Sequence, residues 1–163
     1  MSKIEVNEIA RRSGSSPISI PGHVIQVVQG TYATFTNTTS SSFVDVGLSA
    51  AITPVSSSSK VLVRVAAHGI AQNGGAAKCE LALLRGSTII QYALRPVYVA
   101  ISGGEYGTGS CAIEFLDSPS TTSATTYKLQ FRTRDGGDSC RFNDYHTGSE
   151  RSTSTITLME IAQ

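Results

Sequence analysis

The sequence predicts an all-β fold: an antiparallel β-sandwich, jelly-roll-like, with an extended N-terminal arm. Three observations favour this class. From residue 23 onward, short segments of alternating hydrophobicity recur at intervals of roughly ten residues. Turns rich in Gly, Ser and Pro separate these segments, and no window combines helical periodicity with helix caps. The first and last segments, residues 24–28 and 156–161, are strongly apolar, which suits strands that pair near the middle of a sheet, as in a jelly roll.

The composition fits one folded domain with a tail, or at most two very small domains, and excludes several kinds of protein. Of the 163 residues, 40% are hydrophobic, which is sufficient for a core. The net charge of +1 provides no basic surface, so we expect no nucleic-acid partner. The apolar run at residues 61–67 is short and is interrupted by Arg64, so we expect no membrane insertion. Residues 1–9 lack the apolar core of a signal peptide, so we expect the protein to leave the cytosol only within a larger assembly.

Residues 1–22 are predicted to form an attachment arm and linker, and residues 23–163 the β-sandwich domain. Pro17 and Pro21 restrict the residues before them to extended conformations. The sequence SGSS at residues 13–16 has the composition of a flexible linker. The arm should therefore extend away from the body.

The apolar side chains of the arm are predicted to bind a partner, either a neighbouring copy or a different protein. A strand or helix as short as residues 3–9 buries too little surface to offset its ordering entropy. Such a terminal segment is ordered only when it is docked on something else. The residues expected to make this contact are Ile4, Val6, Ile9, Pro17 and Ile18.

The body is predicted to consist of short strands, which we take in chain order. They span residues 24–29, 32–36, 43–46 continuing at 48–53, 60–70, 78–84, 88–94, 109–116, 126–134, 139–145 and 153–162. Gly47 is expected to form a bulge or bend in the third strand. Period-2 alternation predicts which side chains face the core. They include Val61, Val63, Val65, Ala67, Cys79, Leu81, Leu83, Cys111, Ile113, Phe115, Tyr127, Leu129, Phe131, Ile156 and Leu158.

The three cysteines, Cys79, Cys111 and Cys140, are predicted to be buried free thiols packed as small hydrophobic groups. Each lies in an apolar, alternating run. A disulfide between two of them remains open for a protein that ends up outside a cell. The spacing does not select the pair.

No arrangement of residues indicates catalysis, so we expect neither enzyme activity, nor a cofactor, nor a metal. His23, His68 and His146 are far apart and do not have metal-ligand spacing. No Gly-x-Ser-x-Gly sequence leads from a strand into a helix. The sequence DGGD at residues 135–138 lacks the further acids of a calcium loop and is typical of a hairpin turn.

Aromatic and basic residues near the predicted loops are candidates for contact with a host surface. Tyrosines beside polar groups can stack on sugars, although they can also cover the end of a sandwich or lie in a subunit interface. Arginines beside the hairpin at residues 135–138 could bind an acidic glycan or face acids of a neighbouring subunit. The candidates are Tyr106, Arg134, Arg141 and Tyr145.

Several sequence blocks recur in the order of one protein family. They are KIEVNEI (3–9), SGSSPI (13–18), IPGHVIQVV (20–28), SSFVDVGLSA (41–50), SSKVLV (58–63), LRGST (84–88), LDSP (116–119) and STITLMEI (154–161). In these blocks the chain resembles small virion structural proteins of tailed bacteriophages, tail-fibre-like and of the marine and freshwater phage type. The chain departs from that pattern by longer polar insertions around residues 96–109 and 135–151.

The resemblance implies a homotrimeric tail-fibre or adhesin component, assembled in the host cytoplasm and located in the virion. The arm would bind other virion proteins, and the loops would face the host surface, where a glycan is a candidate ligand. A subunit interface would also explain the small residues Ala66, Ala67 and Gly69. Two alternatives remain open: a capsid decoration protein (cement or head fibre), and a carbohydrate-binding module.

Overall fold

The computed structural model describes residues 20–73, 79–94, 106–134, 139–144 and 151–163. These residues form ten β-strands and no helix, and so no helix among them could cross a membrane. The strands are β1 (Val24–Tyr32), β2 (Thr36–Thr38), β3 (Val44–Ile52), β4 (Lys60–Asn73), β5 (Cys79–Arg85), β6 (Thr88–Leu94), β7 (Tyr106–Asp117), β8 (Thr125–Thr133), β9 (Ser139–Phe142) and β10 (Ser154–Ile161).

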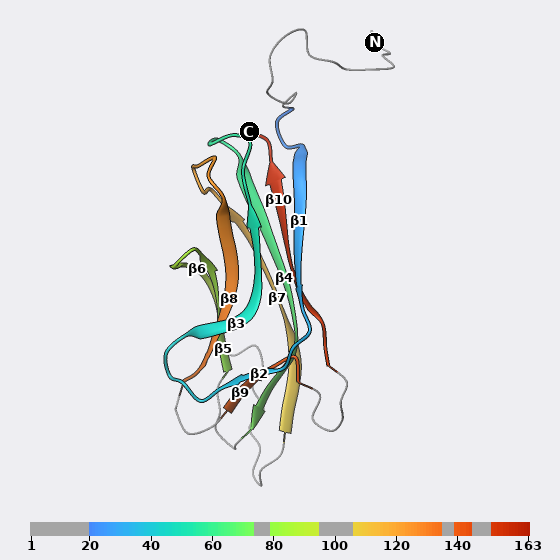
Figure 1. Ribbon diagram of the computed structural model, residues 1–163, viewed down its shortest axis with the longest axis vertical. Coiled ribbons are helices and arrows are strands. Elements are labelled where there is room, and N and C mark those ends of the chain that lie inside the picture. The colour runs from blue at the N-terminus through green and yellow to red at the C-terminus, as the bar shows by residue number, and fades with distance from the viewer. Residues whose placement is uncertain (1–19, 74–78, 95–105, 135–138, 145–150) are drawn as a thin grey trace.

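The strands form two antiparallel sheets, which run side by side along the long axis of the molecule (Figure 1). Sheet A has the order β1-β10-β4-β9-β2, and β7 pairs with the other edge of β4. Sheet B has the order β3-β8-β5-β6. The long strand β4 organises sheet A: its first half lies between β10 and β7, and its last residues pair with both β7 and β9.

The core lies between the two sheets and is built from the alternating apolar side chains that the sequence predicts. In β4, the side chains of Val61, Val63 and Val65 are buried, and in β8 those of Leu129 and Phe131 are buried. Burial of each such side chain stabilises the fold by about 1.5–3 kcal/mol. The inward alternation predicted for these strands is therefore confirmed.

The bend expected at Gly47 is present in β3. The register of β3 against β8 shifts between Asp45 and Ser49, and Gly47 has a φ of 102°. The aromatic ring of Tyr32 occupies the space that a side chain at this position would need. The Tyr32 hydroxyl also forms a hydrogen bond of 2.9 Å with Thr36 Oγ1. Only glycine combines this conformation with such close contact.

The prediction of a separate strand at residues 32–36 is wrong. Tyr32 is the last residue of β1, which pairs with β10 from Val24 to Tyr32. The side-chain amide of Asn143 then donates to the carbonyl oxygens of Tyr32 (2.9 Å) and Thr34 (3.2 Å), where the chain leaves the sheet. The two terminal strands do pair, as predicted. However, only β10 lies inside the sheet, whereas β1 is an edge strand.

The prediction of three free cysteines is also wrong. Cys79 of β5 and Cys140 of β9 form a disulfide that joins the two sheets. Both sulfur atoms are buried because both residues alternate inward, and the sequence contains no signal that they face each other. Cys111 remains a free thiol, half-buried and packed against the core. Burial raises the pKa of the Cys111 thiol.

Candidate interaction surfaces

A continuous row of apolar side chains crosses four strands on the outer face of sheet A, which is the face that points away from the core. Val27 of β1 lies opposite Met159 of β10, Met159 lies opposite Leu62 of β4, and Leu62 lies opposite Leu116 of β7. The side chains at the two ends of the row, Val27 and Leu116, are 57% and 50% exposed. The pairing register thus aligns four large apolar side chains on the outer face, where those at the two ends of the row contact solvent.

The next row of the outer face of sheet A is polar. Gln29 of β1 donates a hydrogen bond of 3.0 Å from Nε2 to Thr157 Oγ1 of β10. Arg64 of β4 pairs with Glu114 of β7, with 2.9 Å between Nε and Oε2. Both charged side chains are more than half exposed, so in this single chain the pair contributes at most about 1 kcal/mol.

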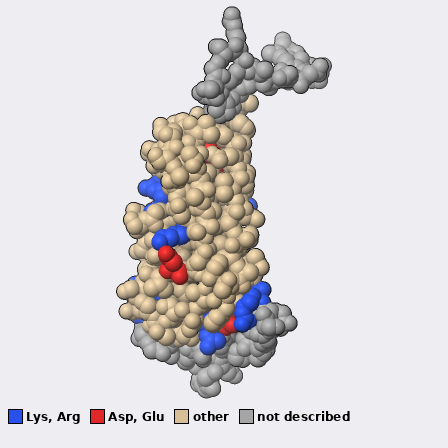
Figure 2. All heavy atoms as spheres, in the orientation of Figure 1, with Lys and Arg blue, Asp and Glu red and all other residues tan. Residues whose placement is uncertain are grey.

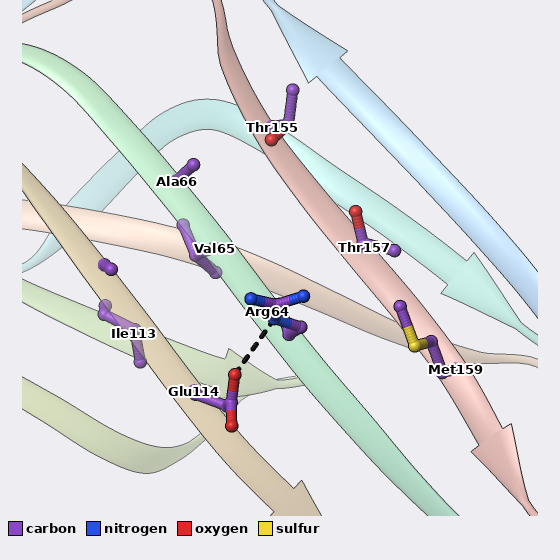
Figure 3. Close-up of a pocket in the computed structure, with 9 residues that line it drawn as sticks. Arg64, Val65, Ala66, Ile113, Glu114, Thr155, Thr157 and Met159 are labelled. Atoms are coloured by element: carbon purple, nitrogen blue, oxygen red, sulfur yellow. Dashed lines mark ion pairs between the residues drawn. The ribbon is translucent and has the colours of Figure 1, made fainter.

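The third row consists of small side chains: Thr31, Thr155, Ala66 and Ala112. Because these side chains are short, the surface between β10, β4 and β7 is hollowed, with a volume of about 270 Å³ (Figure 3). Residues of the second row, among them the Arg64–Glu114 ion pair, also line this hollow. Figure 3 shows the ion pair reaching from β4 to β7.

The outer face of sheet B has a different, charged character. Asp45 of β3 binds Lys128 of β8 at 2.9 Å and accepts a hydrogen bond of 2.7 Å from Gln130 Nε2. Partial burial acts to raise the pKa of Asp45, but the hydrogen bonds from Lys128 and Gln130 outweigh it and hold that pKa below its ordinary value. The ionised form of Asp45 is therefore favoured within the chain itself.

An aromatic and arginine cluster lies further along the outer face of sheet B. The carboxylate of Glu80 is 1% exposed and binds Arg132 at 2.7 Å and Arg134 at 3.6 Å. The Arg132 guanidinium lies 4.4 Å from the ring centroid of Phe43, whose ring is 5.9 Å from that of Tyr92. The buried charge of Glu80 is thus compensated by two cations, as burial of a carboxylate requires.

The predicted site residues fall in different places. Arg134 follows β8 and meets Glu80 on sheet B, whereas Arg141 is a residue of β9 in sheet A. The two arginines thus bind different carboxylates, Glu80 and Asp144. Tyr106 is the first residue of β7. The remaining predicted residues lie outside the part of the chain that the structure describes: Ile4, Val6, Ile9, Pro17, Ile18 and Tyr145.

Arg141 belongs to a polar cluster near β2 and β9, at the end of the molecule opposite the C-terminus (Figure 1). It forms an ion pair of 3.2 Å with the buried Asp144. Its guanidinium lies 6.0 Å from the ring centroid of Phe35, and that of Arg151 lies 5.6 Å from the same ring. On the face that Figure 2 shows, the charged side chains of the described residues form a few small clusters among uncharged residues.

The small residues that suggested an interface have three different environments. Ala66 lies on the outer face of sheet A, in the hollow. Ala67 is fully buried in the core. Gly69 has a φ of 55°, and the backbone of Asp144 occupies the space beside it. Of the three, only Ala66 therefore lines the hollow on the outer face of sheet A.

Among the described residues, no group of three or more His, Cys, Asp or Glu side chains is placed to hold a metal ion. Comparison with known proteins adds no assignment: no protein-family model matches the chain, and no curated protein matches its sequence. The surfaces and the strand order therefore carry the functional conclusion.

Proposed function

We propose that this protein is a structural component of a tailed-phage virion, a homotrimeric fibre or adhesin. Residues 1–22 attach it to other virion proteins, and the loops at the opposite end face the host surface. The protein has no catalytic activity in this role and needs no metal or cofactor. It is assembled in the host cytoplasm and remains in the particle.

The strand order is the observation that carries the proposal. When the short strands β2 and β9 are set aside, eight strands remain. We number these eight strands 1 to 8 in chain order. Sheet A then has the order 1-8-3-6 (β1-β10-β4-β7), and sheet B has the order 2-7-4-5 (β3-β8-β5-β6). This distribution is the order of a jelly roll. We therefore infer a jelly-roll β-sandwich, an architecture that recurs in viral capsid domains.

The position of the chain ends supports a division between attachment and display. The backbone N–H of Gly22 donates to Ala162 O at 2.8 Å, so the arm leaves the body beside the end of β10. The cluster around Arg141 lies at the other end of the molecule (Figure 1). The resemblance of the arm and body to phage virion proteins supports the virion role itself.

Purified particles of the phage that encodes the protein provide the test. We expect mass spectrometry to find the protein in these particles, in a copy number that is a multiple of three. We also expect immunogold labelling to place it on the tail. Labelling of the capsid would instead establish the decoration role. Absence of the protein from the particles would overturn the proposal.

A carbohydrate-binding module is the second candidate, and the cluster on sheet B favours it. Tyr92 is 51% exposed and lies beside Phe43 and the Arg132 guanidinium, a combination of aromatic surface and polar groups that can stack on a sugar ring. In this case, the purified protein would be a monomer that binds glycans, and Tyr92→Ala would abolish binding. A protein that binds no glycan on an array would exclude this candidate.

A further inference from the structure

We propose that the outer face of sheet A is the surface on which copies of this chain meet, with Arg64 of one copy facing Glu114 of the next. The inference rests on the proposed function, because it assumes the homo-oligomer and identifies its contact surface. It also assigns a role to side chains that contribute little within a single chain.

The apolar row is the first argument. Val27, Met159, Leu62 and Leu116 cross the whole width of the sheet without a polar interruption. Its two outermost members are at least half exposed. A contiguous row of apolar side chains on a sheet face is a candidate interaction site, because large exposed apolar patches mark such sites. Contact with a second copy would remove the row from water.

The charge distribution argues that the partner is a second copy. Among the described residues of the four strands, the only charged side chains on the outer face of sheet A are those of Arg64 and Glu114, with that of Lys60 at its end. The two central charges lie side by side on neighbouring strands. Around a threefold axis, Arg64 of each copy can therefore face Glu114 of one neighbour while its own Glu114 faces Arg64 of the other, which a partner of one charge cannot provide.

The outer face of sheet B is a poorer surface for this contact. It carries the exposed Asp45–Lys128 pair together with Arg132 and Arg134 around Glu80. Removing this many charges from water without new partners would cost several kcal/mol. The contrast between the two faces thus assigns the contact to sheet A.

The size and shape of the outer face of sheet A fit a contact between subunits. Four strands about 4.8 Å apart and about eight residues long present on the order of 500 Å² in projection. This approaches the roughly 800 Å² that each partner contributes to a standard interface, and in a trimer the face would be shared between the two neighbouring copies. The hollow at Ala66 and Ala112 provides room for a side chain of the neighbouring copy.

Charge reversal tests the contact by sedimentation velocity on the purified full chain. We expect the wild-type protein to associate at micromolar concentration. Arg64→Glu and Glu114→Arg should each raise the dissociation constant at least about 100-fold, because like charges then face each other across the contact. The double variant, with both substitutions, should recover association because the opposite charges are restored.

The ion pair on sheet B provides a matched control. Asp45 and Lys128 also form an exposed cross-strand pair of 2.9 Å. Asp45→Lys should leave the dissociation constant within a few-fold of wild type. Circular dichroism and thermal melting check that each variant is folded. Leu116→Asp, at the half-exposed end of the apolar row, is an independent variant that should also dissociate the assembly.

The proposal is overturned if the wild-type protein is monomeric. It is also overturned if Arg64→Glu and Leu116→Asp associate normally, or if Asp45→Lys dissociates the assembly as strongly as they do. These results are separable from failure of the proposed function. A protein that associates through sheet A but is absent from virions would refute only the virion role. A monomeric protein that is present in virions would refute the contact surface and the trimer, and would leave the virion role standing.

Discussion

Among the described residues, Glu160 is the most deeply buried acidic residue, and several hydrogen bonds hold its carboxylate in place. It is 0% exposed, and its carboxylate accepts hydrogen bonds from Gln26 Nε2 (2.6 Å) and from the backbone N–H groups of Val55 (2.8 Å) and Ser56 (3.4 Å). Burial acts to raise the pKa of Glu160, but these hydrogen bonds outweigh it and lower the pKa below its ordinary value of 4.5. The charge therefore ties β10 to β1 and to the turn after β3.

Glu160→Gln should destabilise the protein at neutral pH by about 1–3 kcal/mol, because it removes a charged acceptor that is fully bonded. Since the folded-state pKa is lowered, the stabilisation is complete above pH 4.5 and is lost as the pH falls through the folded-state pKa. Urea denaturation at neutral and acidic pH should show that the free energies of unfolding of the wild type and of Glu160→Gln converge in acid. Asp45→Asn, at an exposed carboxylate, should change stability little; equal effects at both sites would contradict the prediction.

Gly47 and Gly86 permit a comparison of backbone strain with close packing. Both have positive φ, 102° and 58°, but the ring of Tyr32 crowds Gly47, whereas a side chain at Gly86 would meet open space. Gly86→Ala should cost about 1–2 kcal/mol through strain alone. Gly47→Ala should cost at least about 1 kcal/mol more, because Tyr32 must also move. Thermal unfolding of both variants measures the difference, and an equal loss would show that Tyr32 yields freely.

At the scale of elements, the Cys79–Cys140 disulfide joins β5 of sheet B to β9 of sheet A across a separation of 61 residues. Closing a loop of this length restricts the unfolded chain and stabilises the fold by roughly 4 kcal/mol in the chain-entropy model. Replacing both cysteines by alanine should lower the free energy of unfolding by about 2–5 kcal/mol. Chemical denaturation with and without a thiol reductant provides the measurement.

Cys111 supplies the control for the disulfide prediction. It is the free, half-buried thiol of β7. Cys111→Ser should leave the effect of the reductant unchanged, because this thiol takes no part in the bridge. If reductant destabilised the Cys79/Cys140 double variant as much as the wild type, the bridge would not be the source of the effect.

The sequence located most strands because their apolar side chains alternate with a period of two. Residues 88–94 match β6, and residues 126–134 differ from β8 by one residue at each end. The error at residues 32–36 arose because a β-rich run does not show which strand it pairs with. The pairing of Tyr32 with Ser154, far along the chain, decides that boundary.

The candidate contact surface could not be predicted in the same way. Val27, Leu62, Leu116 and Met159 each lie beside another apolar residue in the sequence, so nothing in the sequence marks them as members of one outer row. They become a row only through the register of four strands drawn from both halves of the chain. The same holds for the disulfide, because alternation predicts that a thiol is buried but not which other thiol it contacts.

For the whole molecule, removal of residues 1–19 should leave a folded domain. The described body begins with a turn in which His23 N donates to Ile20 O at 3.0 Å, and β1 starts directly after it. We expect circular dichroism and the melting temperature of the truncated protein to resemble those of the full chain. Under the proposed function, the truncated protein should no longer enter particles. Loss of folding would show instead that the arm is part of the core.

The pairing of the two terminal strands also determines where cargo can be added to this protein. Ala162 N donates to His23 O at 2.9 Å, so the end of the sequence lies next to the root of the arm. Under the proposed function, a peptide fused after Gln163 would therefore emerge beside residues 20–23, where the attachment segment joins the body, and would compete with that segment for space on the particle. A peptide inserted beside β2 or β9 would project from the opposite end (Figure 1). Engineered payloads thus belong in an internal connection rather than at the terminus.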